Sequence, residues 1–494
     1  MAGLYSYSFV TDDDYIQLVR AFPPSSLLPF VAQAGVWATE ERRAGKSPIH
    51  AWQEWALADI ARVSIVHSNE FRAGAASIDK LRRIHSAFTL HGNRRLPEDP
   101  LEALLLRLIG QQFGLQADGY LAPARSAAIL LDTYTSKKLE VLGQADWEQN
   151  MLGCSLAEYV TAIQIASACA LTGAGRVLLD RVSSTDAERL LDVVGATTLK
   201  DVVDRHLAID TAAFKKAEEP RRLQAPKNLR RFTFNPLCDR PLLKGYGAGY
   251  LCPSPSLLWA KSAPPALYFT GRAHFGAAND GMAFARDLGH LFEAYVGRNL
   301  KLLPDATLHG EIQAQAGRKG EQLKSVDWIV ETTELVLLVE VKATMPTEPS
   351  RLGDLERASS DWEKVGKAAK QIEAVAGYLR DGHPAYAHIQ PAERPVLGLA
   401  VTLEPFYLIN AYNRLPATST PVYIVSAEEL ERLVSVTSTT AARLLLHHHQ
   451  HEDQSFHLRE VFTGHTFASN PITDRAWRHY PLRRLAMDTP AAAQ

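Results

Sequence analysis

The stretch VDWIVETTELVLLVEVKAT, from Val326 to Thr344, decides the fold of the second half of the chain. Two apolar runs flank the polar letters ETTE, and this pattern predicts a β-hairpin with a polar turn. The second run, Val336 to Val341, is apolar apart from Glu340, so its strand is expected to be largely buried. A buried strand pair of this kind predicts a sheet with helices packed on it.

The pairing of the two strands determines which charged residues lie together. If the two threonines of ETTE form the tip, Asp327 faces Leu338 across the hairpin, and facing residues project from the same side of a sheet. Glu340 and Lys342 follow Leu338 at a period of two, so they share that side. The hairpin therefore predicts two carboxylates and one ammonium on one face, and only an odd-numbered loop would separate them.

These three charged groups cost free energy on an apolar strand pair unless another group compensates them, because unpaired charge is heavily penalised in a protein interior. A hard divalent cation would compensate the carboxylates of Asp327 and Glu340, and Mg²⁺ prefers such oxygen ligands. Lys342 would then orient or help to deprotonate a water molecule, or neutralise charge on a phosphate. The alternative is a simple ion pair between Glu340 and Lys342 on a solvated strand edge.

The elements expected around the hairpin form a mixed α/β unit, in the order helix, three strands, helix and two strands. Hydrophobic periodicity predicts the helices over Met282–Leu302 and Leu355–Leu379. The predicted strands lie near Leu308–Gln315, Gln322–Val330, Leu335–Lys342, Pro395–Leu403 and Pro421–Val425.

The first half of the chain has a different character. From about Asp12 to Phe214, apolar residues recur at three- and four-residue spacing, which predicts amphipathic helices, and Ser155 is an expected N-cap. The proline-broken, polar segment Glu218–Arg231 is interpreted as a linker. We therefore expect a multidomain α+β chain. Its parts would be a helical recognition or regulatory domain at 1–228, an extended connecting segment at 229–281 packed on the unit that follows, and an α/β domain with a C-terminal extension at 282–494.

With Asp327 as a first acid and Glu340–Lys342 as an E-x-K, the second half resembles the PD-(D/E)XK nuclease superfamily, whose members have the restriction-endonuclease-like fold. Val326 stands where the family has the proline of its name. The order of elements from Met282 to Val425 is similar to the core of that fold. The resemblance covers only this stretch. It implies that the two acids bind Mg²⁺ or Mn²⁺ and that Lys342 assists the attack of water on a phosphodiester.

A helix-borne glutamate often supplements the metal site in similar nucleases, and Glu293 is the candidate here. Gly289 and Gly297 lie one turn on either side of Glu293, so this helix is expected to approach the sheet closely. The alternative is a solvated carboxylate that pairs with Arg286 or Arg298.

Some resembling nucleases also carry a Lys or Gln on the helix that follows the E-x-K strand. Gln371 is the candidate, on one helical stripe with Lys364 and Lys367 and beside Lys370. A solvated helix face is the alternative, and for each lysine taken singly it is the preferred interpretation.

Two other charged stretches are interpreted as structural. Basic residues gather between Lys215 and Arg231, and phosphate binding is the functional alternative, but acidic neighbours favour a solvated linker. The histidines between His447 and His451 are interpreted as the end of a surface helix rather than a zinc site.

The whole chain has 494 residues, with 53 Lys and Arg against 55 Asp and Glu and a net charge of −2, the ordinary composition of a globular protein. Its 4 scattered cysteines fit a reducing compartment, and its first residues lack the pattern of a signal peptide. The most apolar stretch, Val160–Gly175, is interrupted by polar residues and is too short to span a membrane. These features predict a soluble, cytoplasmic protein, and the near-neutral charge argues against tight, indiscriminate DNA binding.

The sequence thus predicts an Mg²⁺-dependent endonuclease acting on nucleic acid, with DNA the expected substrate. Asp327, Glu340 and Glu293 would be metal ligands, and Lys342 and Gln371 would complete the catalytic residues. By analogy with bacterial restriction and phage-defence proteins, the helical half would be a recognition or regulatory domain. It could also form a homo-oligomer or bind a partner protein. Two alternatives stay open: a catalytically inactive nuclease-fold module that binds nucleic acid or protein, and cleavage of RNA.

Overall fold

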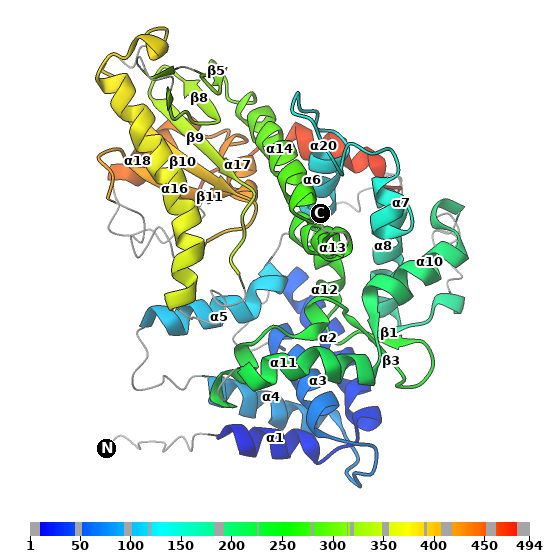
Figure 1. Cartoon of the computed structure of the whole chain (residues 1–494). Helices are drawn as coiled ribbons and strands as arrows, with labels where there is room; N and C mark the ends of the chain where they lie inside the picture. Colours follow the sequence, from blue (N-terminus) through cyan, green and yellow to red (C-terminus); the bar gives the residue numbers. More distant parts are fainter. Residues whose placement is uncertain are drawn as a thin grey trace, which may run out of the picture. The chain divides into compact units, whose positions relative to one another are not determined.

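The computed structural model divides the chain into two compact units (Figure 1). The first unit consists of Met1–Pro123, Glu148–Leu267 and Arg478–Gln494, and the second of Ala124–Trp147 and Tyr268–Trp477. The structure describes residues 10–44, 52–92, 101–116, 120–181, 192–224, 227–277, 281–313, 315–316, 321–347, 355–389, 393–406, 417–450 and 461–481.

Helices dominate the first unit. They are α1 (Asp12–Arg20), α2 (Pro24–Arg43), α3 (Glu54–His67), α4 (Ile78–Gly92), α5 (Leu101–Gln116), α8 (Leu156–Thr172), α10 (Ala196–Val202), α11 (Thr211–Gln224) and α12 (Pro255–Ala260). Short 3₁₀ and π turns lie at η1 (Leu179–Arg181), η2 (Val203–Leu207), η3 (Lys227–Phe232) and η4 (Pro236–Cys238). A small sheet has the order β1-β4-β3-β2, with bounds Arg176–Val177, Tyr250–Leu251, Leu242–Lys244 and Ala208–Ile209.

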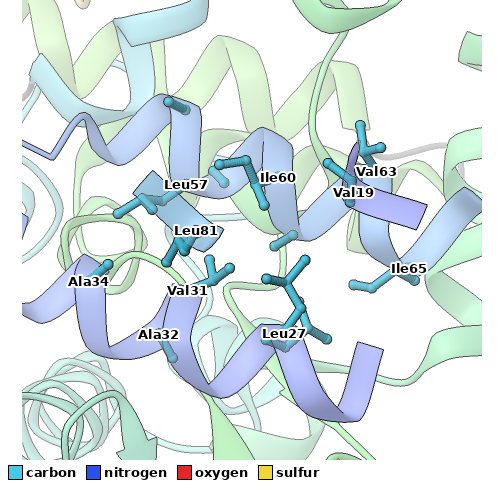
Figure 2. Close-up of a cluster of buried hydrophobic side chains, with 14 of the residues drawn as sticks. Val19, Leu27, Val31, Ala32, Ala34, Leu57, Ile60, Val63, Ile65 and Leu81 are labelled. Carbon is cyan, nitrogen blue, oxygen red and sulfur yellow. The ribbon is translucent and has the colours of Figure 1, made fainter. Parts of the chain in front are cut away.

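The core of the first unit forms where α1 to α4 meet. Leu27 and Val31 of α2 and Leu57 and Ile60 of α3 have no exposed surface, and their side chains point toward one another in Figure 2. Their spacing of three or four residues is the one that gives a helix an apolar stripe. Amphipathic periodicity is therefore sufficient to explain this layer of helices.

Capping also follows the local sequence. Ser155 caps α8 as expected, because its hydroxyl accepts the Glu158 amide hydrogen at 3.2 Å while the Glu158 carboxylate accepts the Ser155 amide at 2.8 Å. Such a reciprocal capping box satisfies two backbone donors that a helix start would otherwise leave unpaired.

The prediction that Glu218–Arg231 is a linker is wrong. Its first part continues α11 through Pro220, and its last part is the 3₁₀ turn η3. Glu218 is buried and forms an ion pair with Arg62 at 3.0 Å, and the Arg231 guanidinium lies 3.7 Å from the Phe88 ring centroid. The charged side chains of Glu218 and Arg231, which suggested a solvated segment, instead hold this segment against the core.

The segment expected to connect two domains at 229–281 is also placed differently. Up to Leu267 it belongs to the first unit, where β3 pairs with β2 and β4. At the other end of the chain, the buried Tyr480 donates a hydrogen bond to the Pro123 carbonyl at 2.9 Å within the same unit. Pairing between distant strands, and packing of the C-terminal residues against a distant part of the chain, leave no local signal in the sequence.

One helical stretch among the described residues, Trp147–Thr172, is long and apolar enough to cross a membrane by length and composition. In the structure, Gly153 with φ +78° separates α7 (Trp147–Leu152) from α8, and 67% of the apolar window is buried in the protein. Burial of most of this stretch inside the protein explains why it is so apolar.

The second unit is built on a five-stranded sheet with the order β11-β10-β9-β8-β5. Its strands are β5 (Thr307–Gly310), β8 (Trp328–Glu331), β9 (Val336–Lys342), β10 (Val396–Thr402) and β11 (Val422–Ser426). The first three pair antiparallel and the last three parallel, so the sheet is mixed. A separate two-stranded ribbon is formed by β6 (Gln315–Ala316) and β7 (Glu321–Gln322).

The helices and strands expected around the hairpin are all found, but two strands are shorter than predicted: β5 ends at Gly310 rather than Gln315, and β8 begins at Trp328 rather than Gln322. The two predicted helices are α14 (Gly281–Leu300) and α16 (Leu355–Arg380). The later helices of this part of the chain are α17 (Ala427–Leu433), α18 (Ala441–Gln450) and α20 (Pro471–Ala476), and short 3₁₀ turns lie at η6 (Pro384–Tyr386) and η7 (Trp477–His479). Three helices that begin in one unit and end in the other are α6 (Leu121–Leu130), α7 and α13 (Pro264–Gly276).

Two helices cover the two faces of the sheet. Ile372 and Val375 of α16 pack against Ile329 and Leu338, and Figure 1 shows α16 crossing β9, β10 and β11. Trp328 precedes Ile329, so it projects from the opposite face, where α14 lies against it. Alternation along β8 thus places α16 and α14 on opposite sides of the hairpin.

Candidate metal and phosphate site

The hairpin forms as expected, but its register differs by two residues from the expected one. Trp328 pairs with Val339, so continuing the register places Asp327 opposite Glu340 rather than Leu338. The cause is a four-residue loop, which Thr332 closes because its hydroxyl accepts the amide hydrogens of Glu334 and Leu335 at 3.2 and 3.0 Å. A shift of two preserves which side each residue faces.

Four polar side chains meet on the α16 side of the hairpin. The Asp327 carboxylate accepts the Val341 amide hydrogen at 2.7 Å, and the Lys342 Nζ donates to the Glu340 Oε1 at 2.5 Å. Lys342 also donates to the Gln371 Oε1 at 3.3 Å, and the Gln371 Nε2 donates to the Ser325 carbonyl at 3.3 Å. The residues whose proximity the sequence predicted at this hairpin are therefore neighbours in the structure.

Burial governs the electrostatics of the two acids. Glu340 is 2% exposed, and Asp327 is partly buried beside it. Burial, the charge of Glu340 and, to a smaller extent, the charge of Glu293 together raise the pKa of Asp327 to about 7. Burial also raises the pKa of Glu340, against the opposing effect of the Lys342 ammonium. One ammonium does not compensate two neighbouring carboxylates.

A buried oxygen remains unsatisfied at this site. The Glu340 Oε2 is buried and has no hydrogen-bond partner in the described part of the chain, although the Asp327 backbone amide and the Gln371 side chain lie close enough to lower the pKa of Glu340. A buried anionic oxygen without a partner costs free energy, so its presence needs an explanation such as an ion or a water molecule. Hard oxygen donors are the ligands that Mg²⁺ prefers, and this cation commonly takes one or two carboxylates and completes its shell with water and substrate. The donor set thus fits the predicted cation.

Glu293 is held by a lysine that the sequence did not indicate. The Lys137 Nζ donates to both carboxylate oxygens of Glu293, at 2.9 and 2.7 Å. The two arginines named as alternative partners have other contacts: Arg286 donates to Glu140 at 2.8 Å, and Arg298 donates to the Thr133 hydroxyl at 2.7 Å. Glu293 is close enough for its charge to act on Asp327, but its role as a metal ligand stays a prediction.

Lys137 is the functional candidate that sequence reasoning missed. It lies in the segment 131–146, which the sequence assigned to the helical domain and which belongs to the second unit. Burial acts to lower its pKa, but the hydrogen bonds and charge of Glu293 raise it above the ordinary value, and Asp327 and Glu311 add to the effect. No pattern in TYTSKKLE signals this proximity, because it depends on contacts about 150 residues apart.

One of the two glycines lets α14 approach the hairpin. A Cβ at Gly297 would lie 2.3 Å from the Trp328 ring, whereas a Cβ at Gly289 would meet nothing within 4 Å. The Trp328 Nε1 donates to the Glu293 carbonyl at 3.1 Å and fixes the same contact. Close approach is therefore confirmed at Gly297 and is wrong at Gly289.

The remaining lysines of the α16 stripe face solvent. Lys364 forms an ion pair with Asp361 at 3.2 Å, and Lys367 and Lys370 are exposed. His447 is exposed near the end of α18, as expected for a surface helix, while the side chains of His448 and His449 and all of His451 lie outside the described residues.

Within the described ranges, no three His, Cys, Asp or Glu side chains form a group with the geometry of a metal site. A search for similar proteins gives no match to a family model, a curated protein or a solved structure. The functional argument therefore rests on the geometry of the hairpin and on its chemistry.

Proposed function

We propose that the second unit is a Mg²⁺-dependent nuclease of the PD-(D/E)XK superfamily, with a restriction-endonuclease-like core, that hydrolyses phosphodiester bonds in DNA. The observation that carries the proposal is the meeting of Asp327, Glu340 and Lys342 on one face of an otherwise apolar hairpin, with an unsatisfied buried oxygen on Glu340. Helix α14, three antiparallel strands, α16 and a parallel strand follow one another in the order that the resemblance implies.

Each side chain has a distinct role in this proposal. Asp327 and Glu340 would hold Mg²⁺ or Mn²⁺, and Glu293 would supplement them, since its charge acts on Asp327. When bound, the cation supplies Lewis-acid polarisation of the phosphate and of the attacking water. The Lys342 Nζ orients that water and neutralises charge that develops on the phosphate oxygens. Gln371 keeps the Lys342 ammonium in place through its Oε1.

The test is cleavage by the full-length chain with Mg²⁺, on single-stranded DNA, duplex DNA and RNA in parallel. Lys342→Ala is expected to lower the cleavage rate by about 10²-fold or more, the usual effect of removing a charged group that acts in the transition state. Lys367→Ala is the matched control, because this lysine lies on the same helix as Gln371 and faces solvent. Thermal unfolding of each variant checks that the fold is kept. Unchanged cleavage by Lys342→Ala would refute the assignment.

A further inference from the structure

The segment 131–146, here called the α14 loop, is attached to helix α14 at both of its ends. Near its start, the Arg298 guanidinium donates to the carbonyl of Asp132 at 3.1 Å and to the Thr133 hydroxyl at 2.7 Å. Near its end, the fully buried Asp287 carboxylate accepts the amide hydrogens of Val141 and Leu142 at 2.6 and 2.9 Å. Charged hydrogen bonds to a buried carboxylate are strong, so the loop has a fixed path along α14.

The middle of the α14 loop lies beside the candidate site. Lys137 binds Glu293 there, and the charge of Asp327 acts on Lys137. Tyr134 precedes Lys137 by three residues, so its Cα is within about 11 Å of the Lys137 Cα, the span of three extended residues. The backbone at Tyr134 and Lys138 therefore lies near Lys137 and the carboxylates that act on it.

This part of the loop carries an exposed aromatic and an exposed basic side chain. Tyr134 is 87% exposed, and Lys138 is exposed one residue after Lys137. A large aromatic side chain held in water on an anchored loop contributes little to folding. An exposed ring with an ammonium nearby is the combination that binds single-stranded nucleic acid, because a base stacks on the ring and the cation contacts the backbone.

We infer that the α14 loop binds substrate, with Tyr134 stacking on an unpaired base and Lys138 contacting an adjacent phosphate. The inference rests on the proposed nuclease function and extends it to a class of substrate: a nucleic acid strand, DNA or RNA, that lacks a pairing partner at the loop. Duplex DNA presents phosphates to the loop but keeps the faces of its bases stacked on one another. Stacking on Tyr134 therefore discriminates single strands from blunt duplexes, whereas Lys138 acts on both.

The test is binding of fluorescein-labelled oligothymidine, oligouridine and a blunt DNA duplex to the full-length chain in EDTA, where binding is independent of cleavage. Tyr134→Ala is expected to weaken binding of a single strand by about tenfold or more and of the duplex by less than about twofold. Tyr134→Phe keeps the stacking ring and should bind within about twofold of the unaltered chain. Lys138→Ala should weaken binding of all strands and reduce the slope of log affinity against log salt by about 1.

Phe71→Ala is the matched control, since Phe71 is an aromatic residue of the first unit that is 95% exposed, and this variant should bind like the unaltered chain. Unchanged single-strand binding by Tyr134→Ala, or an equal loss for the duplex, would overturn the inference. Cleavage that depends on Lys342 would still stand in that case, so failure of the inference and failure of the proposed function are distinguishable.

Discussion

At the scale of single residues, the site makes it unfavourable for Asp327 to carry a negative charge. Its carboxylate lies opposite Glu340, and a single ammonium at Lys342 serves both acids. Burial and the neighbouring charge of Glu340 raise the pKa of Asp327 to about 7. An ionised Asp327 therefore destabilises the folded chain when no cation is bound. This is expected of a carboxylate that binds a cation rather than one that only stabilises the fold.

This cost predicts how stability depends on pH in a metal-free buffer. An unfolded Asp loses its proton near pH 4, whereas folded Asp327 keeps it until about pH 7. Between these values the folded state binds more protons than the unfolded state, so ionisation of Asp327 lowers the free energy of unfolding as pH rises. Asp327→Asn should thus match the unaltered chain in Tm near pH 4 and exceed it at about pH 8. A Tm difference that does not change with pH would contradict the raised pKa.

Residue patterns predicted the charged cluster but not the groups around it. The side on which Asp327, Glu340 and Lys342 lie depends only on alternation along two adjacent strands, so a register error of two residues left that conclusion intact. Lys137 was beyond prediction, because its contact with Glu293 depends on a loop that returns from a distant part of the chain. Local rules carry no information on such contacts.

At the scale of elements, the position of α14 decides how near Glu293 comes to the hairpin. The sequence offered Gly289 and Gly297 as equivalent small neighbours of Glu293. Only the structure separates them, because the Trp328 ring occupies the space beside Gly297 and leaves Gly289 open. The predicted bounds of α14, α16, β9, β10 and β11 agree with the structure, since each follows from its own hydrophobic period, whereas β5 and β8 are shorter than predicted.

The two glycines make a matched pair of variants. Gly297→Ala should lower the free energy of unfolding by about 1–3 kcal/mol, because its methyl group would overlap the Trp328 ring. Gly289→Ala should raise it by about 0.5–1 kcal/mol, since the helix gains rigidity without a clash. Urea denaturation of both variants measures these changes. Equal effects of the two substitutions would contradict the packing of α14 on the hairpin.

At the scale of the whole molecule, each compact unit is assembled from separate pieces of the chain. The second unit needs Ala124–Trp147, which supplies Arg125 as well as Lys137. Arg125 pairs with the buried Glu431 at 2.5 Å, and the Tyr295 hydroxyl donates to the same carboxylate at 2.7 Å. The sequence placed the boundary at 282, where the first helix of the expected α/β unit begins, but composition does not show which pieces pack together.

This assembly predicts the behaviour of fragments. A fragment of residues 268–477 leaves Glu431 buried without Arg125, a loss that costs about 3–5 kcal/mol for a buried pair. It is expected to show no cooperative unfolding transition by circular dichroism. A fusion of residues 124–147 to the start of that fragment through a Gly/Ser linker should regain the transition. Cooperative unfolding of 268–477 alone would contradict the division into these units.

The net charge of −2 averages a mostly buried pair of acids with basic side chains that are exposed to solvent, such as Lys138. Asp327 and Glu340 lie together beneath Lys342, while Lys138 on the α14 loop is exposed. Local placement of charge governs how a polyanion is attracted, so the near-zero sum is compatible with the proposed partner.

The measurement that tests the central claim most directly is calorimetric titration of the full-length chain with Mn²⁺ at about pH 8, above the pKa of Asp327. The account predicts saturable binding that Asp327→Ala abolishes and that Glu334→Ala, at the tip of the same hairpin, leaves unchanged. Absence of binding, or binding that survives Asp327→Ala, would contradict the claim that this carboxylate pair holds a divalent cation.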